Sequence, residues 1–209
     1  MQIRFIFTLI LTIYCTLSYG QESTERLRHV SNNLTTIKIK KNLEDKAIIY
    51  GNFIRRKKFT STGVSEFIVI REMESDKEYF FFVKPPNSNK DSNPFLFFLP
   101  EGEYQIINYG AIVPKAFGGY KYYTGPVFKR FDYYSEQNKR DLDGGLIDEN
   151  AQERFSFEVK KGKVFYLGSW NFDSGYINFF DDKLKLDKKM KIKINKKVDY
   201  KNAIIKLPL

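Results

Sequence analysis

The sequence predicts one antiparallel β-sandwich domain built from about eight to ten short strands. From residue 45 onward, short runs rich in Ile, Val, Phe and Tyr alternate with turn-forming residues, and no stretch shows sustained helical periodicity. Aromatic residues make up 17% of the chain, which is far more than a disordered tail contains. These features favour a sandwich over a parallel α/β sheet, and a closed β-barrel is the alternative arrangement of the same strands.

Residues 1–20 have the pattern of a secretory signal peptide. Arg4 precedes an apolar run that ends near Leu17, and this run is shorter than the roughly 20 residues that a membrane-spanning helix needs. We expect cleavage after Gly20, because Ser18 and Gly20 provide the small side chains that the peptidase prefers. Gln21 would then begin the mature chain, which we expect in the periplasm, the cell envelope or the extracellular space.

Cys15, the one cysteine of the chain, offers an alternative end to this segment. A bacterial lipoprotein carries its lipidated cysteine just after such an apolar run, so a lipid on Cys15 would tether the protein to a membrane. Tyr14 stands where lipoproteins have a small residue, which favours cleavage after Gly20. In both cases no internal disulfide can form, and the folded domain must rely on its core.

Residues 21–44 are polar and mixed in charge, which predicts a linker or N-terminal extension before the domain. The alternation at 36–40 indicates an edge strand at its end. His29, the only histidine, is expected to be a solvated residue of this linker.

The domain itself is expected to cover residues 45–209. Its strands are separated by turn signals such as Ser75-Asp76 and Pro85-Pro86, and residues 135–154 are expected to form a long charged loop. The first two strands are expected to form a hairpin. Candidate strands lie at 47–56, 66–72, 78–85, 93–99, 103–113, 155–160, 163–171, 176–182, 188–195 and 203–207, with up to two more within 118–135.

Two glycine-containing turns each predict a hairpin. In PEGEY, Pro100 fixes φ and Gly102 can adopt a positive φ, and Gly162 has the same role in VKKGK. Gly168 predicts a bulge or close packing beneath Trp170. The aromatic run that follows Gly162 is expected to line the core, and an aromatic ligand-binding platform is the alternative.

The order of these motifs resembles that of uncharacterised bacterial envelope domains, which combine an early strand, a Pro-x-Gly-x-Tyr hairpin and a late Val-x-x-Gly-Lys-x-x-Tyr-Leu-Gly hairpin. The resemblance implies an exported β-sandwich that is often tethered as a lipoprotein, and it implies no enzymatic activity. It covers about residues 46–180 and rests on AIIYGNF (47–53), FLPEGEYQI (98–106) and FEVKKGKVFYLGSW (157–170).

The formal net charge of +10 favours anionic partners. Most of the basic residues are lysines, whereas proteins that recognise nucleic-acid bases rely on arginine, and Arg55-Arg56 is the only pair of adjacent arginines. We therefore expect no nucleic-acid partner. An anionic lipid or a polysaccharide of the envelope or of a host surface is the expected partner.

The residues needed for most kinds of catalysis are missing. Nucleophilic catalysis requires a base beside the nucleophile, and a zinc site requires nitrogen or sulfur ligands, but the chain has one histidine and one cysteine. It also has no glycine-rich phosphate loop in a strand-to-helix context. We expect no cofactor and no enzymatic activity; a carboxylate-based hydrolase of the glycosidase type is the alternative.

A calcium site is the alternative interpretation of the acidic residues in the charged loop, because oxygen ligands suffice for calcium. Asp141, Asp143 and Asp148 are spaced as in a calcium loop, but the fifth and twelfth positions, Gly145 and Gln152, lack the expected ligands. A solvated acidic turn is the favoured interpretation.

Tyrosines concentrate in the least regular part of the domain. If this region is exposed, the tyrosines and nearby basic residues would form a binding surface. The favoured interpretation is that alternate tyrosines pack inside the sandwich. The predicted binding surface comprises Tyr120, Tyr122, Tyr123, Lys129, Arg130, Tyr133 and Tyr134.

Taken together, these features predict a non-catalytic exported envelope protein that acts as a binding or structural module through its surface loops. The alternatives are a carboxylate-based hydrolase and a subunit of a larger envelope assembly.

Overall fold

The structure is a computed structural model that describes residues 24–54, 63–88, 90, 92–172 and 175–209. The predicted signal peptide, Cys15, the cleavage site between Gly20 and Gln21, and the Arg55-Arg56 pair lie outside these residues. None of the helices within the described ranges combines the length and the apolar character that crossing a membrane requires.

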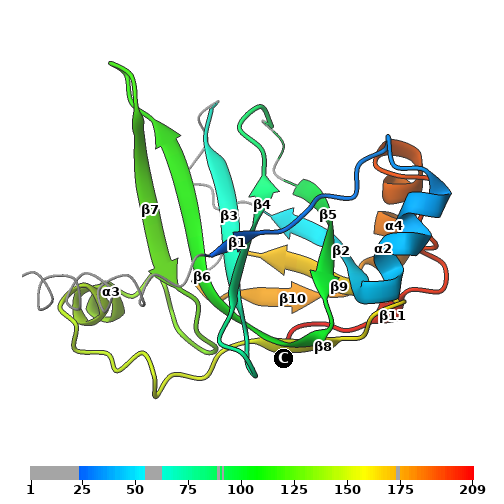
Figure 1. The fold of residues 1–209 in the computed structure, drawn as a ribbon. Coiled ribbons are helices and arrows are strands. Elements are labelled where there is room, and N and C mark those ends of the chain that lie inside the picture. The colour runs from blue at the N-terminus through cyan, green and yellow to red at the C-terminus, as the bar shows by residue number, and fades with distance from the viewer. Residues whose placement is uncertain (1–23, 55–62, 89, 91, 173–174) are drawn as a thin grey trace, which may run out of the picture.

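Two β-sheets pack against each other, which confirms the predicted sandwich (Figure 1). Strands account for 42% and helices for 17%, and the described strands form two separate sheets instead of one closed barrel. The first sheet contains β1 (Glu25–Arg26), β4 (Glu78–Lys84), β3 (Ser65–Glu72), β6 (Gly102–Pro114) and β7 (Tyr120–Pro126), with β8 (Ser156–Val159) also paired to β6. The second contains β10 (Asn178–Phe180), β9 (Val164–Asn171), β2 (Lys46–Ile54) and β5 (Ser92–Pro100), with β11 (Ile204–Ile205) paired to β9.

Both sheets are mixed, not purely antiparallel. β3–β4 and β6–β7 are antiparallel pairs of consecutive strands, as short turns require. The pairs β1–β4, β2–β9 and β9–β11 are parallel. Each parallel pair joins strands that are far apart in the sequence, so no local turn signal could reveal it.

The two glycine-containing turns pass the chain from one sheet to the other. Gly102 and Gly162 have positive φ values of +156° and +77°, as their turns predict. The turn at 100–102 joins β5 of the second sheet to β6 of the first, and the turn around Gly162 joins β8 of the first sheet to β9 of the second. The predicted hairpin pairings at these two turns are therefore wrong, because a tight turn reverses the chain without fixing which sheet the next strand joins. The predicted pairing of β2 with β3 is also wrong, since β2 belongs to the second sheet and β3 to the first.

The inner core fills the space between the two sheets. Its largest member, Trp170, is fully buried, and Gly168 before it has a φ of +88°, in agreement with the predicted bulge. Other members include Ile49, Phe53, Ile68, Ile70, Phe81, Phe95, Tyr104, Ile106, Phe157 and Leu167.

A second buried cluster, the outer core, covers the other face of the second sheet. Helix α2 (Thr36–Asp45) and helix α4 (Lys183–Lys193) lie over this face, at one end of the molecule in Figure 1. The helices add a third layer to the sandwich. The outer core comprises Val30, Leu34, Ile39, Ile48, Tyr50, Leu96, Phe98, Tyr166, Leu186, Met190, Val198, Tyr200 and Ala203.

Three segments differ from the sequence-based expectation. Residues 36–40 belong to α2, whose first turn is capped by Thr35 Oγ1 accepting a hydrogen bond from the Lys38 N–H at 3.2 Å. Residues 188–195 fall mostly in α4, and the predicted charged loop contains helix α3 (Glu136–Asp143). The two strands were predicted because isoleucines alternate with lysines, and this prediction is wrong. In a helix, residues two positions apart lie on opposite sides, so Ile39 is the only buried residue of α2.

The N-terminal and C-terminal segments connect the two sheets. The Leu27 N–H donates to the Phe80 carbonyl of the first sheet at 2.9 Å, and the Val30 N–H donates to the Leu96 carbonyl of the second at 3.1 Å. In the C-terminal segment, Leu209 exchanges two backbone hydrogen bonds with Ser156 of the first sheet, and β11 pairs with β9 of the second. The segment from residue 24, expected to be a linker, therefore packs as part of the sandwich.

Gly51 allows β2 to approach its neighbours closely. A Cβ atom at this position would lie 2.5 Å from Phe95 Cζ and 2.6 Å from the Gly168 carbonyl oxygen. We expect Gly51→Ala to lower the free energy of unfolding by about 1–3 kcal/mol, measured by urea denaturation, because the backbone of β9 must shift. Gly125→Ala is the control: its Cβ would have no atom within 4 Å. Equal losses in both variants would contradict the close-approach argument.

Candidate functional site

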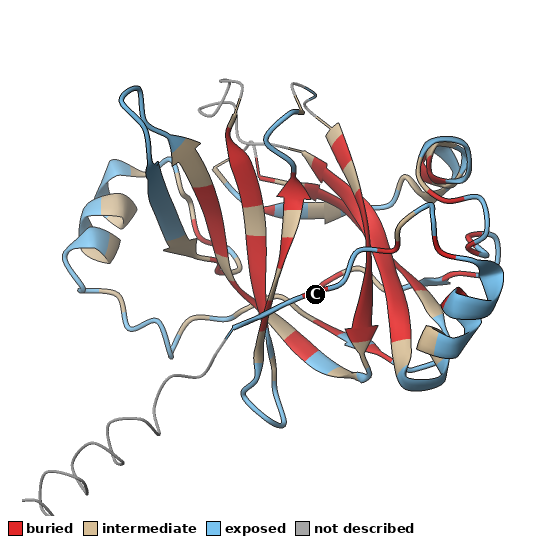
Figure 2. Ribbon diagram, turned by 45° about the horizontal axis from the view of Figure 1, so that its top comes forward, coloured by how far each residue is buried: buried red, intermediate tan, exposed pale blue. Residues whose placement is uncertain are grey.

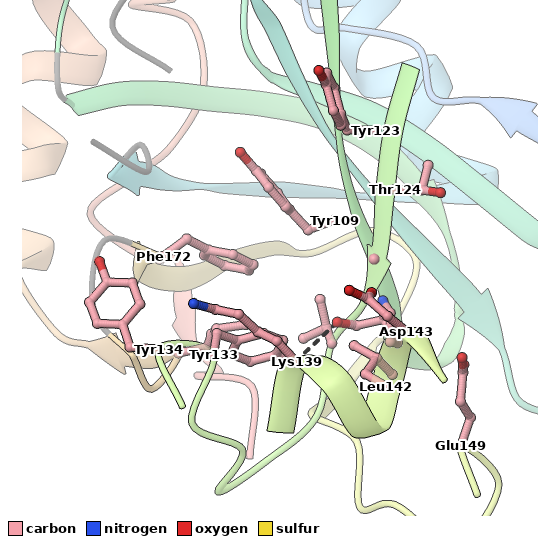
Figure 3. A pocket seen from close by; sticks show the side chains of 14 residues that line it. Tyr109, Tyr123, Thr124, Tyr133, Tyr134, Lys139, Leu142, Asp143, Glu149 and Phe172 are labelled. Carbon is pink, nitrogen blue, oxygen red and sulfur yellow. Dashed lines mark hydrogen bonds between the residues drawn. The ribbon is translucent and has the colours of Figure 1, made fainter. Parts of the chain in front are cut away.

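A pocket of about 520 Å³ lies beside β7, where this strand faces α3 and the segment that follows β9. Figure 3 shows Tyr109, Tyr123, Tyr134, Phe172 and Lys139 arranged around it. Its volume falls in the range of small-molecule sites, which is roughly 300–1,000 Å³. The remaining lining residues are Thr124, Gly125, Pro126, Val127, Tyr133, Leu142, Asp143, Glu149 and Ile177.

One wall of the pocket comes from β7, which pairs with β6 and with no other described strand. The β6–β7 hairpin turns at Gly118 and Gly119, whose φ values are +89° and +80°. Phe117 at its tip is fully exposed. Lys121 Nζ lies 4.6 Å from the centre of the Tyr123 ring, so the two side chains share one face of the strand.

The tyrosines of the predicted binding surface are largely at the surface. Tyr120, Tyr122, Tyr123 and Tyr134 are exposed, and β7 stands out as an exposed strand in Figure 2. The favoured interpretation, that alternate tyrosines pack inside the sandwich, is therefore wrong for these four. Exposure is necessary for binding; binding itself stays a prediction.

Tyr133 has a structural role. Its hydroxyl donates to the Pro126 carbonyl at 3.0 Å and accepts from the Phe128 N–H at 2.7 Å. Its ring contacts that of Phe131 at a centroid distance of 4.7 Å, and its own N–H donates to the Gly175 carbonyl at 2.7 Å. Tyr133 thus fixes the loop after β7 and holds Tyr134 beside the pocket.

The second wall comes from α3, a helix that the sequence analysis missed. Ser135 caps its first turn by accepting from the Asn138 N–H at 3.2 Å, and Gly145 follows its end with a φ of +68°. A serine before Glu136 and a glycine pair after Asp143 are ordinary start and stop signals for a helix, so they could have identified it. The short helix contributes Lys139, Leu142 and Asp143 to the pocket.

The charged side chains of the pocket remain in contact with water. Asp143 is exposed, and Lys139 forms an ion pair with Glu136. Glu149, with a side chain that is 51% exposed, pairs with Arg154 at 3.4 Å. Burial lowers the pKa of Arg154, whose Nη1 also donates to the Ile107 carbonyl at 2.8 Å.

Lys129 and Arg130 lie apart from the pocket lining. Lys129 is half-buried, with its N–H donating to the Glu153 carbonyl at 2.8 Å, and Arg130 is exposed. The structure therefore brings Tyr123, Tyr133 and Tyr134 of the predicted surface to the pocket, whereas Tyr120 and Tyr122 lie outside its lining.

The calcium candidates do not converge. Asp141 and Asp143 are two positions apart on α3, a spacing that places side chains on different faces of a helix. Asp141 Oδ1 accepts from Gln137 Nε2 at 2.6 Å, and Asp148 Oδ1 accepts from the Asn150 N–H at 3.0 Å. Across the described ranges, no three His, Cys, Asp or Glu side chains gather into a group that could hold a metal.

His29 is exposed, as expected, but it is not in a free linker. It forms a β-bridge with Phe97 at the edge of the second sheet, and the two rings meet edge to face at 5.3 Å.

No protein-family model, curated protein or solved structure matches this chain. The resemblance to bacterial envelope domains therefore stays an expectation.

Proposed function

We propose that this protein is a non-catalytic, exported binding module that holds a segment of an envelope polysaccharide between β7 and α3. The proposal rests mainly on one observation: the pocket is open to solvent and combines exposed tyrosine rings with charged side chains at its edge. Tyrosine has an apolar ring and a polar hydroxyl, a combination suited to partners with apolar and polar parts. Sugars are such partners, because their C–H faces stack on aromatic rings while their hydroxyls bond to charged groups.

The anchoring of the pocket supports binding without large rearrangement. Tyr133 ties the loop after β7 to that strand, and Asn138 Nδ2 donates to the Asp132 carbonyl at 3.2 Å, which ties α3 to the same loop. A site on such a pre-ordered frame loses less conformational entropy when it binds.

The test is a pair of matched double variants. We expect Tyr123→Ser with Tyr134→Ser to weaken binding at least tenfold, since removing an aromatic anchor commonly costs more than about 1 kcal/mol. Tyr120→Ser with Tyr122→Ser removes the same side chains outside the pocket and should change affinity less than about twofold. Binding is measured by calorimetry with the best ligand from an array of bacterial envelope oligosaccharides.

Two results would contradict the proposal. Equal losses in the two double variants would assign binding to the flat face of the strand, and no oligosaccharide binding at all would exclude a polysaccharide partner. Circular dichroism of each variant checks that the fold is intact.

A carboxylate-based hydrolase remains the second candidate, because Asp143 and Glu149 line the same pocket. A general acid needs a desolvated carboxyl group, whereas Asp143 is exposed and Glu149 is paired with Arg154. Release of reducing ends from the bound oligosaccharide, abolished by Glu149→Gln, would favour the hydrolase over the binding module.

A further inference from the structure

Helix α4 presents two different faces, and its inner face is firmly attached to the second sheet. Leu186 and Met190 are buried in the outer core. Asp187 accepts from the Tyr50 hydroxyl and from Lys183 Nζ, both at 2.6 Å, and Lys183 also donates to the Tyr200 carbonyl at 2.7 Å. The only carboxylate of the helix is therefore engaged on its inner side.

The outer face of α4 combines exposed aliphatic and cationic side chains. Leu184 is 83% exposed and Ile192 is 81% exposed. At 3.6 residues per turn these two positions differ by about 80° around the helix axis, so they share one face. Lys185, Lys188 and Lys191 are exposed on the same side, and Figure 2 shows the helix layer at the surface of the molecule.

This side of the molecule is strongly positive. Burial, and next the charge of Lys90 and Lys193, lower the pKa of Lys189. Lys196 and Lys197 lie three and four residues after the end of the helix, and Lys197 Nζ donates to the Leu34 carbonyl at 2.8 Å. The lysines thus surround the two aliphatic side chains without an exposed carboxylate within α4.

We propose that the outer face of α4 docks on an anionic lipid surface, with Leu184 and Ile192 entering the boundary of the acyl chains and Lys185, Lys188 and Lys191 neutralising lipid phosphates. A basic helix that also exposes large aliphatic residues suits the interface of an anionic bilayer. An acidic polysaccharide would attract the lysines but offers nothing to bury the two aliphatic side chains. The docking face is separate from the pocket and does not depend on its ligand.

The test places a fluorescent reporter on this face of the full chain. In Ile192→Trp, the added tryptophan should shift its emission to the blue with vesicles of dioleoylphosphatidylcholine and dioleoylphosphatidylglycerol, and brominated lipids should quench it. The native Trp170 is fully buried and gives a constant background. The control is Leu146→Trp, at a position that is 78% exposed beyond α3 and should show no shift. A site-specific reporter is needed because the apolar run at 5–17 can itself bind vesicles.

Replacing Lys185, Lys188 and Lys191 by Gln in the Ile192→Trp protein should lower the partition coefficient for the anionic vesicles by roughly 100-fold, since each lysine near an anionic surface contributes about 1 kcal/mol. The partition coefficient is obtained from the emission change as lipid is added. The control replaces three exposed lysines elsewhere, Lys115, Lys160 and Lys161, by Gln in the same protein. It should change the partition coefficient by less than about fivefold.

Three results would overturn the proposal. The first is an unchanged emission of Ile192→Trp with the anionic vesicles at low salt. The second is an equal shift with phosphatidylcholine alone, which would remove the role of charge. The third is an equal shift with alginate, which would show that the face binds polyanions in general.

Discussion

Trp170→Ala is expected to lower the free energy of unfolding by about 3–5 kcal/mol. The side chain is fully buried between the sheets, and its ring lies 5.1 Å from Phe95, 5.4 Å from Phe179 and 6.1 Å from Phe81, measured between centroids. Its Nε1 donates to the Leu167 carbonyl at 2.8 Å. The truncation would leave a cavity shared by both sheets and remove this hydrogen bond.

Urea denaturation followed by far-ultraviolet circular dichroism measures the effect, because the variant has no tryptophan to report by fluorescence. Tyr122→Ala provides the control: this aromatic side chain is 66% exposed, and its loss should change stability by less than about 0.5 kcal/mol. A loss below about 1 kcal/mol for Trp170→Ala would mean that the core collapses around the missing ring, contrary to its close packing.

The sequence was sufficient to predict the fold class and most strand positions, because the signals for them are local. The runs at 66–72, 78–85 and 163–171 became β3, β4 and β9 with small shifts at their ends. What the sequence could not show is the division of the strands between the sheets. The turn residues Gly102 and Gly162 have the conformations that they predict, yet both turns connect different sheets.

The helices α2 and α4 show why alternation can mislead. TIKIK and KMKIKI read as strands, since apolar and charged residues alternate. In α4 the residues that reach the core, Leu186 and Met190, are four apart, and the other aliphatic residues, Leu184 and Ile192, face solvent. Tertiary packing therefore overrides the period-two pattern.

The sequence predicted only part of the candidate site. The tyrosine-rich region supplies one wall of the pocket, and the missed helix α3 supplies another. Phe172 and Ile177 come from a distant part of the chain and carry no local mark of a site. They meet the tyrosines only because β9 and β6 belong to opposed sheets.

High pH is expected to destabilise the fold steeply. Tyr50, Tyr104, Tyr166 and Tyr200 are buried, and burial is the main reason why the pKa of each is raised above the usual value. Hydrogen bonds reinforce the effect: the hydroxyls of Tyr50 and Tyr166 donate to Asp187 and Asp182, at 2.6 and 2.7 Å. A phenolate at either position would face a carboxylate.

The direction of this pH dependence follows from the number of phenolic protons that the folded and unfolded states bind. Below about pH 10 the folded and unfolded states both keep the four phenolic protons, so the contribution of these tyrosines to the free energy of unfolding is fully present. Above it the unfolded chain loses protons that the folded chain retains, and the free energy of unfolding falls by about 1.4 kcal/mol per pH unit for each tyrosine. Four tyrosines give a loss of about 5–6 kcal/mol per pH unit, enough to unfold a domain of ordinary stability within roughly one to three units.

Urea midpoints measured between pH 8 and 11.5 test this expectation. The double variant Tyr50→Phe with Tyr166→Phe keeps the rings but removes two of these four titrating groups, so its stability should fall less steeply above pH 10 by about 3 kcal/mol per pH unit. Absorbance at 295 nm reports phenolate, and circular dichroism reports the fold. Tyr104 lies between the sheets, and the other three lie in the outer core under the helices. Because the four hydroxyls can ionise only when this packing is lost, their part of the absorbance change should coincide with loss of the dichroism signal. Full ionisation of all tyrosines while the dichroism signal persists would show that these four hydroxyls are accessible to water in the folded protein.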